Sequence, residues 1–411
     1  MITKLKEIFG QKESLKILLS SMLTMASLGV VYTWSVFIIP LETEFGWARN
    51  QISFIFTVSI FFFSTGIGFG GFLNRRLALK KLILLEIVIL AFSFTMASFS
   101  QNLTNMIFFY GFLCGLFMGI MYNTLIYLCN LWFDKEHAAT VSGFLQTCLA
   151  ASTVLLSYFA AGLLEYYDWR VVFRVMGCII AVSFLVALKV LRAPQVTVSV
   201  SGNPTSSSHV ALTGINWQRM LRTTTFWLFW FIRMITLAGG IGMLGHAVPV
   251  ALEAGASYSN AILALGLVSF CNALGRTLFG AIWDYAGLRK TCSINGLFFI
   301  ASFVLLFFVS LYPNQLVTLL AFGLCGFSYG GTNIIGVSFT REVFGMKYFS
   351  ENYGLSTSAT MCSTFVGPYL MGEVRQVTGS YEYSFLLFIG LGIFVWLLLL
   401  LMPKVSYATE E

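Results

Sequence analysis

The chain has 411 residues, of which 58% are hydrophobic and only 10% charged, and its mean hydropathy is +0.84. A water-soluble protein with so few charged side chains could not solvate its surface, so lipid is predicted to surround most of the chain. The sequence shows no nucleophile, metal cluster or pair of carboxylates at a common depth in the apolar runs. We therefore expect neither an enzyme nor a bound cofactor or metal.

Hydrophobic runs predict twelve membrane-spanning helices, because each run approaches the roughly 20 residues that a helix needs to cross a bilayer. The runs are 15–40, 48–73, 81–101, 103–131, 138–163, 168–191, 224–253, 258–284, 289–311, 314–341, 349–372 and 380–402. Lysines precede the first run, as in a secretory leader, but the run is too long and lacks a small-residue cleavage pattern. We expect it to be a first span and not a removed leader.

Lysine and arginine are distributed unevenly between the two sides of the membrane that these spans define. Of 24, 18 lie on the side of the N-terminus, two lie inside spans, and four lie opposite: Arg49, Arg170, Arg174 and Arg375. Basic residues concentrate on cytoplasmic loops. Both termini are therefore expected in the cytoplasm. We also expect the protein to lie in the cell's inner (plasma) membrane and to be a monomer. The net charge of +7 follows from this topology, so no nucleic-acid partner is expected.

A polar stretch divides the chain into two similar halves. We predict an N-terminal six-helix bundle at 1–192, a flexible cytoplasmic linker rich in Ser, Thr, Pro and Gly at 193–223, and a C-terminal six-helix bundle at 224–411. Residues near the ends of the predicted spans repeat across the linker at a spacing of about 210 residues, which is typical of a duplicated unit. The matched pairs are Pro40 with Pro249, Gly46 with Gly255, Gly70 with Gly280, Asn74 with Asp284, Phe133 with Phe344, and Gly143 with Gly354.

Four ionisable side chains lie within the predicted spans: Glu86, Arg233, His246 and Arg276. A charge at this depth costs several kcal/mol, so each is expected to have a partner, a function or a path to the interface. Glu86 and Arg233 are about two turns from the ends of their spans, so we expect them to reach the membrane interface. Arg276 is too deep for this and should face a central cavity. Its guanidinium can hold a carboxylate through two parallel hydrogen bonds, which predicts a small organic anion as ligand. The alternative is a structural arginine bound to backbone carbonyls.

The number of cations in the cavity indicates whether the ligand is a monoanion or a dianion. The run 349–372 contains no lysine or arginine, so Arg276 is the one cation that we place firmly in the cavity. A dicarboxylate would leave one desolvated carboxylate without a partner. The sequence therefore favours a monoanion.

Further site candidates come from the same spans. His246 can bind the anion or carry a proton, or it is an ordinary interfacial histidine. Asn272 lies one turn before Arg276 on the same helix face, where it can orient the guanidinium, contact the ligand or join helices. Polar and aromatic residues of the first, fourth and tenth spans are expected to line the cavity, although packing is the alternative for each. They are Tyr32, Trp34, Tyr122, Asn123, Tyr329 and Asn333.

Three segments carry a family resemblance. Gly280-Ala-Ile-Trp-Asp284-Tyr-Ala-Gly287-Leu-Arg289-Lys290 resembles the loop between the second and third helices of each half in the major facilitator superfamily. Tyr32-Thr-Trp34-Ser-Val-Phe-Ile-Ile-Pro40-Leu41 resembles the first span of the oxalate:formate antiporter branch. Asn272-Ala-Leu-Gly275-Arg276 resembles the eighth helix that this branch shares with the monocarboxylate porters. The resemblance implies an all-α membrane fold, carboxylate binding by Arg276, and a cavity lined by Tyr32, Tyr122 and Tyr329.

Two departures from these relatives narrow what the resemblance implies. The oxalate carriers have a lysine in the eleventh span that is absent here, which favours lactate, pyruvate or another monocarboxylate. The animal porters have an aspartate where Asn272 stands and a lysine in the first span, so proton coupling through that aspartate is not available. We expect a proton-coupled monocarboxylate transporter working by alternating access. An exchanger of the oxalate:formate type and an exporter of another small solute are the alternatives.

Overall fold

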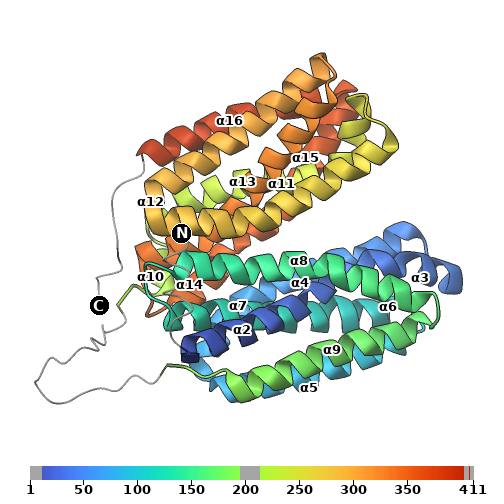
Figure 1. Cartoon of the computed structure of the whole chain (residues 1–411), viewed down its shortest axis with the longest axis vertical. Coiled ribbons are helices and arrows are strands. Elements are labelled where there is room, and N and C mark those ends of the chain that lie inside the picture. Colours follow the sequence, from blue (N-terminus) through green and yellow to red (C-terminus); the bar gives the residue numbers. More distant parts are fainter. Residues whose placement is uncertain (1–11, 195–212, 402–406, 408–411) are drawn as a thin grey trace, which may run out of the picture.

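The computed structural model describes residues 12–194, 213–401 and 407 (Figure 1). Ten helices within this part of the chain are long and apolar enough to cross a membrane. One of them, α12 (Tyr258–Leu311), is two helices that meet at Gly287, whose φ of 73° interrupts the helical path. A further crossing is made by α14 (Phe349–Ser356) followed by α15 (Ser358–Thr378). The prediction of twelve spans in an all-α membrane protein is thus confirmed.

The spans form two bundles (Figure 1), and the element bounds give six spans in each. In the first bundle, the opening span is α2 (Lys12–Ser27), η1 (Leu28–Phe37) and α3 (Ile38–Phe45) in succession. It is followed by α4 (Arg49–Arg76), α5 (Leu79–Ser98), the fourth span of α6 (Leu103–Met106), η2 (Ile107–Cys114) and α7 (Gly115–Trp132), then α8 (Ala138–Leu164) and α9 (Trp169–Val190). The second bundle contains α11 (Thr224–Glu253), α12, α13 (Gln315–Phe344), α14, α15 and α16 (Glu382–Leu401).

Close helix contacts and buried aromatic rings hold the first bundle together. A Cβ on Gly119 would lie 2.0 Å from the Phe63 carbonyl oxygen, so α7 and α4 can approach only because this position is glycine. The Trp34 indole stacks on Tyr110 with ring centroids 4.6 Å apart and donates to the Ile52 carbonyl at 3.0 Å. Trp34 is therefore a core residue of the bundle, although the sequence suggested a cavity wall.

The end of the linker is folded. Residues 195–212 of the predicted flexible segment lie outside the described residues, but Thr213–Ile215 pair with the turn between α13 and α14. The Ile215 amide donates to the Phe344 carbonyl at 3.2 Å, and the Lys347 amide donates to the Thr213 carbonyl at 3.1 Å. The short helix α10 (Trp217–Met220) follows. The last part of the linker is thus attached to the second bundle.

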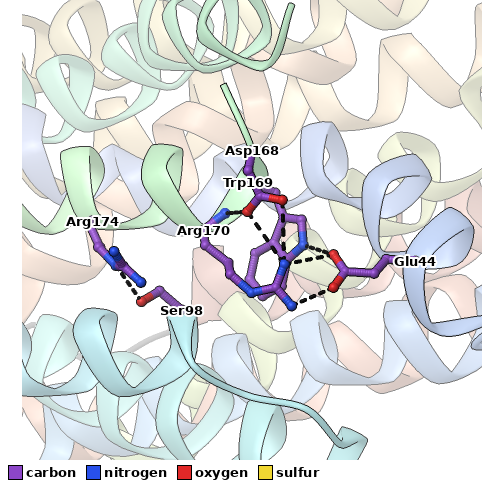
Figure 2. A network of polar contacts seen from close by, with 6 residues as sticks. All are labelled: Glu44, Ser98, Asp168, Trp169, Arg170 and Arg174. Carbon is purple, nitrogen blue, oxygen red and sulfur yellow. Dashed lines mark hydrogen bonds and ion pairs between the residues drawn. The ribbon is translucent and has the colours of Figure 1, made fainter. Parts of the chain in front are cut away.

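The two bundles are joined at the end of the molecule that carries α10 and α14, where α8 packs on α12 and α4 packs on α14 (Figure 1). At the opposite end each bundle makes its own polar contacts. Figure 2 shows Glu44 of α3 bound to Trp169 and Arg170 of α9, with Arg174 donating to Ser98 at 2.9 Å.

A similar pair lies at the same end of the second bundle, where Arg375 donates to Glu253 at 2.6 Å. The helices of the two bundles diverge toward this end in Figure 1. The molecule is therefore sealed at the end with the linker.

Candidate functional site

Arg276 of α12 lies where the two bundles meet. Its Nη1 donates to the backbone carbonyl of Gln146 on α8 at 3.0 Å, and its Nε donates to Asn272 Oδ1 at 3.3 Å. A guanidinium has five N–H donors, so these bonds leave three for another acceptor, including both on Nη2. Within the described part of the chain, no acidic side chain forms an ion pair with Arg276. The group is therefore a cation with three N–H donors that are unused within the described residues.

Tyrosines from three helices lie within electrostatic range of this guanidinium. They are Tyr32 of η1, Tyr122 of α7 and Tyr329 of α13. Tyr32 of the first bundle and Tyr329 of the second lie within electrostatic range of one another. The structure thus brings five of the predicted site residues together: Arg276, Asn272, Tyr32, Tyr122 and Tyr329. The 3₁₀-helical η1 and the π-helical η2 lie in the two first-bundle spans that supply these tyrosines, and such irregular helices often mark functional sites.

Tyr353 of α14 also belongs to this cluster, and the sequence analysis missed it. It lies near Tyr122 and within electrostatic range of Arg276. Tyr122 is in the fourth span of the first bundle, and Tyr353 is in the eleventh span of the chain. A tyrosine near the start of a span that contains many hydroxyl groups is a signal that the sequence does offer.

Asn123 lies outside the cluster around Arg276. Its side chain is fully buried, and Nδ2 donates to the Ile67 carbonyl at 2.6 Å and to the Ser350 carbonyl at 3.1 Å. It also accepts from the Ser350 hydroxyl at 2.6 Å. Consecutive residues of a helix face different directions, so Tyr122 points to the cluster around Arg276 while Asn123 joins α7 to the start of α14.

His246 of α11 makes its contacts within the second bundle. Nε2 lies 3.0 Å from the Pro368 carbonyl and Nδ1 lies 2.9 Å from the Tyr381 hydroxyl. A carbonyl only accepts, so Nε2 carries the hydrogen and Nδ1 accepts from Tyr381 in the neutral tautomer. Both partners lie beyond the polar stretch of α15, toward the open end of the bundle.

Arg233 of α11 corrects a prediction. It is only 2% exposed, so the expectation that it reaches the membrane interface is wrong. Nη1 donates to the Ser356 carbonyl and to the Ser356 hydroxyl, each at 2.9 Å. That carbonyl is free because the helix breaks at Thr357, where the Thr360 amide turns to the Thr357 carbonyl instead. A cation next to the last carbonyls of a helix is favourable, so Arg233 stabilises the end of α14.

The expectation for Glu86 of α5 is also wrong. Its side chain is fully buried, and within the described residues neither carboxylate oxygen has a hydrogen-bond partner. It shares a helix face with Leu82, Leu90 and Ser93, which are buried as well. Counting turns from the end of a span gives depth, but the direction of the side chain decides whether it can reach the interface.

Gln146 of α8 is a further residue that the sequence analysis missed. Its side chain is fully buried, and neither the amide nitrogen nor the amide oxygen has a hydrogen-bond partner within the described residues. Its backbone carbonyl is the one that accepts from Arg276. It is the only amide side chain in the run 138–163, which is the signal that could have identified it.

Comparison with known proteins identifies the family. The family model of the Major Facilitator Superfamily matches residues 17–368. The chain therefore belongs to this superfamily of membrane transporters, and it is a transporter and not an enzyme.

Individual relatives are distant. The chain is 22% identical to the oxalate:formate antiporter of Oxalobacter formigenes, over 82% of this chain and 79% of the relative. It is 23% identical to monocarboxylate transporter 2 of Rattus norvegicus, over 90% of this chain and 78% of the relative. The proton:xylose symporter XylE matches with a TM-score of 0.70 at 12% identity, covering 96% of this chain and 97% of that structure. The E. coli fucose:proton symporter FucP matches with a TM-score of 0.71 at 13% identity, covering 95% and 98%. These structures confirm the fold.

Proposed function

We propose that this protein is a secondary active transporter of small monocarboxylates, such as lactate or pyruvate, coupled to protons. The observation that supports this most is Arg276, a cation with three unused N–H donors between the two bundles and with tyrosines of both bundles within electrostatic range. A carboxylate accepts two parallel N–H bonds from such a fork. The likeness to a monocarboxylate transporter and to an oxalate:formate antiporter supports the same class of ligand.

Alternating access gives the hydrogen bond between Arg276 and the Gln146 carbonyl a mechanical role. The guanidinium belongs to the second bundle but donates to Gln146 of the first, so rocking of the bundles must change this bond. A bound carboxylate offers the guanidinium replacement acceptors. If both termini are cytoplasmic, as the distribution of Lys and Arg predicts, the sealed end faces the cytoplasm and this conformation receives its anion from outside.

Proton coupling follows from the charge of the ligand. Moving one negative charge inward against a negative-inside potential costs about 2.3 kcal/mol per 100 mV, and an accompanying proton removes this cost. His246 is one candidate carrier, and the carboxylate of the ligand is the other. The Tyr381 hydroxyl can either donate or accept, so His246 can gain a proton at Nδ1 and keep its partner. The charged groups nearby are Arg375, which lies over the Tyr381 ring, and Glu253, its ion-pair partner.

The binding role of Arg276 is tested with purified protein in liposomes and radiolabelled lactate. An inward proton gradient should drive uptake, and Arg276→Gln should reduce uptake at least about 100-fold, which is about 2.7 kcal/mol. Arg276→Lys should also fail to restore it, because an ammonium lacks the planar fork. Arg174→Gln, which removes an exposed arginine at the far end of the first bundle, is the control. Uptake that survives Arg276→Gln would contradict the proposal.

The role of His246 is tested separately. In His246→Ala, the pH dependence of lactate uptake should flatten while counterflow between equal lactate concentrations continues. Tyr381→Phe should retain part of the pH dependence, because the imidazole remains. An unchanged pH profile in His246→Ala would leave the carboxylate of the ligand as the proton carrier.

An organic-anion exchanger of the oxalate:formate type is the second candidate, and Arg233 favours it. The eleventh span has no cation of its own, but Arg233 donates to Ser356 and Thr360 of that span. The buried Arg233 and the half-buried Arg276, both near Tyr353, could hold two carboxylates if Arg233 left Ser356. In this case oxalate should compete with lactate in the native protein, and Arg233→Gln should abolish the competition without abolishing lactate binding.

A further inference from the structure

Gln146 occupies a particular position on α8. Its neighbours Gly143 and Thr147 face α12: a Cβ on Gly143 would lie 2.5 Å from the Arg276 carbonyl oxygen, and Thr147 Oγ1 donates to the Ala273 carbonyl at 2.7 Å. Ser142, one turn before Gln146, accepts from Asn130 of α7 at 2.9 Å. By helical periodicity, Gln146 lies between the face directed at α7 and the face directed at α12. Arg276 of α12 lies next to this side of α8, because its guanidinium donates to the Gln146 carbonyl.

The other buried polar side chains of α8, Ser142 and Ser152, have hydrogen-bond partners, and Gln146 is the exception. The half-buried Thr147 is bonded to α12, and the half-buried Thr153 donates to the Leu149 carbonyl of its own helix. Leaving a buried amide without a partner costs about 1–3 kcal/mol. The unpaired amide of Gln146 can therefore gain hydrogen bonds from a ligand held at Arg276.

The backbone of the same residue establishes its proximity to the candidate anion site. Arg276 Nη1 is 3.0 Å from the Gln146 carbonyl oxygen, so the guanidinium lies next to the backbone from which the Gln146 side chain starts. A glutamine side chain turns about three bonds and presents both a donor and an acceptor. It can thus reach an atom of the ligand next to the carboxylate that Arg276 holds.

We propose that Gln146 is a specificity-determining residue that binds the oxygen on the carbon next to the carboxyl group of the ligand. The inference rests on the proposed function and deepens it: the ligands are 2-hydroxy and 2-oxo acids, in preference to simple fatty acids. The amide N–H donates to the keto or hydroxyl oxygen, and the amide oxygen accepts the hydroxyl proton. Arg276 belongs to the second bundle and Gln146 to the first, so such an acid links the two bundles as they close.

Comparison of lactate with propionate tests this, because the two acids differ only by the 2-hydroxyl group. A site that hydrogen bonds a ligand oxygen discriminates strongly against the analogue that lacks it. Uptake of each labelled acid is measured in liposomes for the native protein, Gln146→Met, which keeps the volume without the amide, and Gln146→Asn, which keeps the amide on a shorter stem. The control is Ser142→Ala, which removes a satisfied polar group one turn away on the same helix.

The native protein should prefer lactate by at least about tenfold. Gln146→Met should lose this preference while propionate uptake stays within about twofold, and Gln146→Asn should retain part of it. Ser142→Ala should change both acids equally. An equal loss of both acids in Gln146→Met, with Gln146→Asn the same, would reduce Gln146 to a packing residue and overturn the inference. A native protein that carries neither acid would instead refute the proposed function and this inference with it.

Discussion

The seam between α8 and α12 and the seam between α4 and α14 occupy equivalent places in the duplicated chain, but they are built with different chemistry. In the first, the Asp284 carboxylate accepts from the Ala139 and Thr140 amides at 3.2 and 2.8 Å and from the Thr140 hydroxyl at 2.6 Å. These amides are in the first turn of α8, whose own N-cap residue supplies no side-chain bond. The second bundle thus caps a helix of the first with a negative charge, which the helix dipole favours.

The second seam has a neutral amide at the matching position. Asn74 donates to the Ser350 hydroxyl at 2.9 Å, but its oxygen accepts from Thr124 of its own bundle and not from the amides of α14. An ion pair between Arg75 and Glu351, 3.0 Å apart, supplements it. The comparison indicates that duplication preserved the place of contact, while the charged helix cap is present in only one seam. We therefore expect the two seams to differ in strength, and the following experiments measure the difference.

The largest effect should come from the glycines of the seams. A Cβ on Gly280 would lie 2.5 Å from the Ala139 carbonyl oxygen, and one on Gly71 would lie 2.5 Å from the Ser350 carbonyl oxygen. Gly280→Ala and Gly71→Ala should each destabilise the sealed conformation by about 1–3 kcal/mol, because backbone atoms must move. Electron–electron distance measurements between spin labels at Lys135 and Lys290, with the exposed Cys178 and Cys362 replaced, should show a larger population of the separated state.

Gly162→Ala is the matched control for these variants. A Cβ at Gly162 of α8 meets no atom within 4 Å, so its distance distribution should equal that of the native protein. If the two seam variants gave unchanged distributions as well, close backbone approach would not be what holds the sealed end.

A smaller effect is expected from neutralising the charged cap. Asp284→Asn keeps the shape of the side chain but removes its charge, so we expect it to cost about 1 kcal/mol of the preference for the sealed state. Asn74→Asp should give no matching gain, because the oxygen of Asn74 already accepts from Thr124. The same spin-label pair reports both variants. An equal and opposite response of the two would show that the seams are equivalent after all.

The smallest effect should come from the ion pair of the second seam. The Arg75 side chain is 50% exposed, and a pair with one half-exposed partner contributes about 0.2–1 kcal/mol. A double-mutant cycle with Arg75→Gln and Glu351→Gln, read from the same distance distributions, should give a coupling in this range that falls with added salt. A coupling above about 2 kcal/mol would make this seam the stronger one and reverse the comparison.

Much of the fold could be predicted from hydropathy and loop charge because membrane insertion is a local property of each run of about 20 residues. The depth of Arg276 and the repeat that pairs Asn74 with Asp284 could be predicted for the same reason, since both depend on counting along the chain. The side chains gathered around Arg276 were predicted less completely. Tyr32, Tyr122 and Tyr329 lie there, whereas Asn123 and His246 make their contacts elsewhere.

What the sequence by itself determined is therefore the class of protein, the order of the spans and the depth of each charge. Only the tertiary structure decided which way each side chain points. Arg233 and Glu86 are at depths from which they could have reached the membrane interface, but both face inward. Tyr353 and Gln146 stand beside Arg276 because helices distant in sequence meet there. The direction of a side chain depends on the rotation of its helix, and contacts between helices set that rotation.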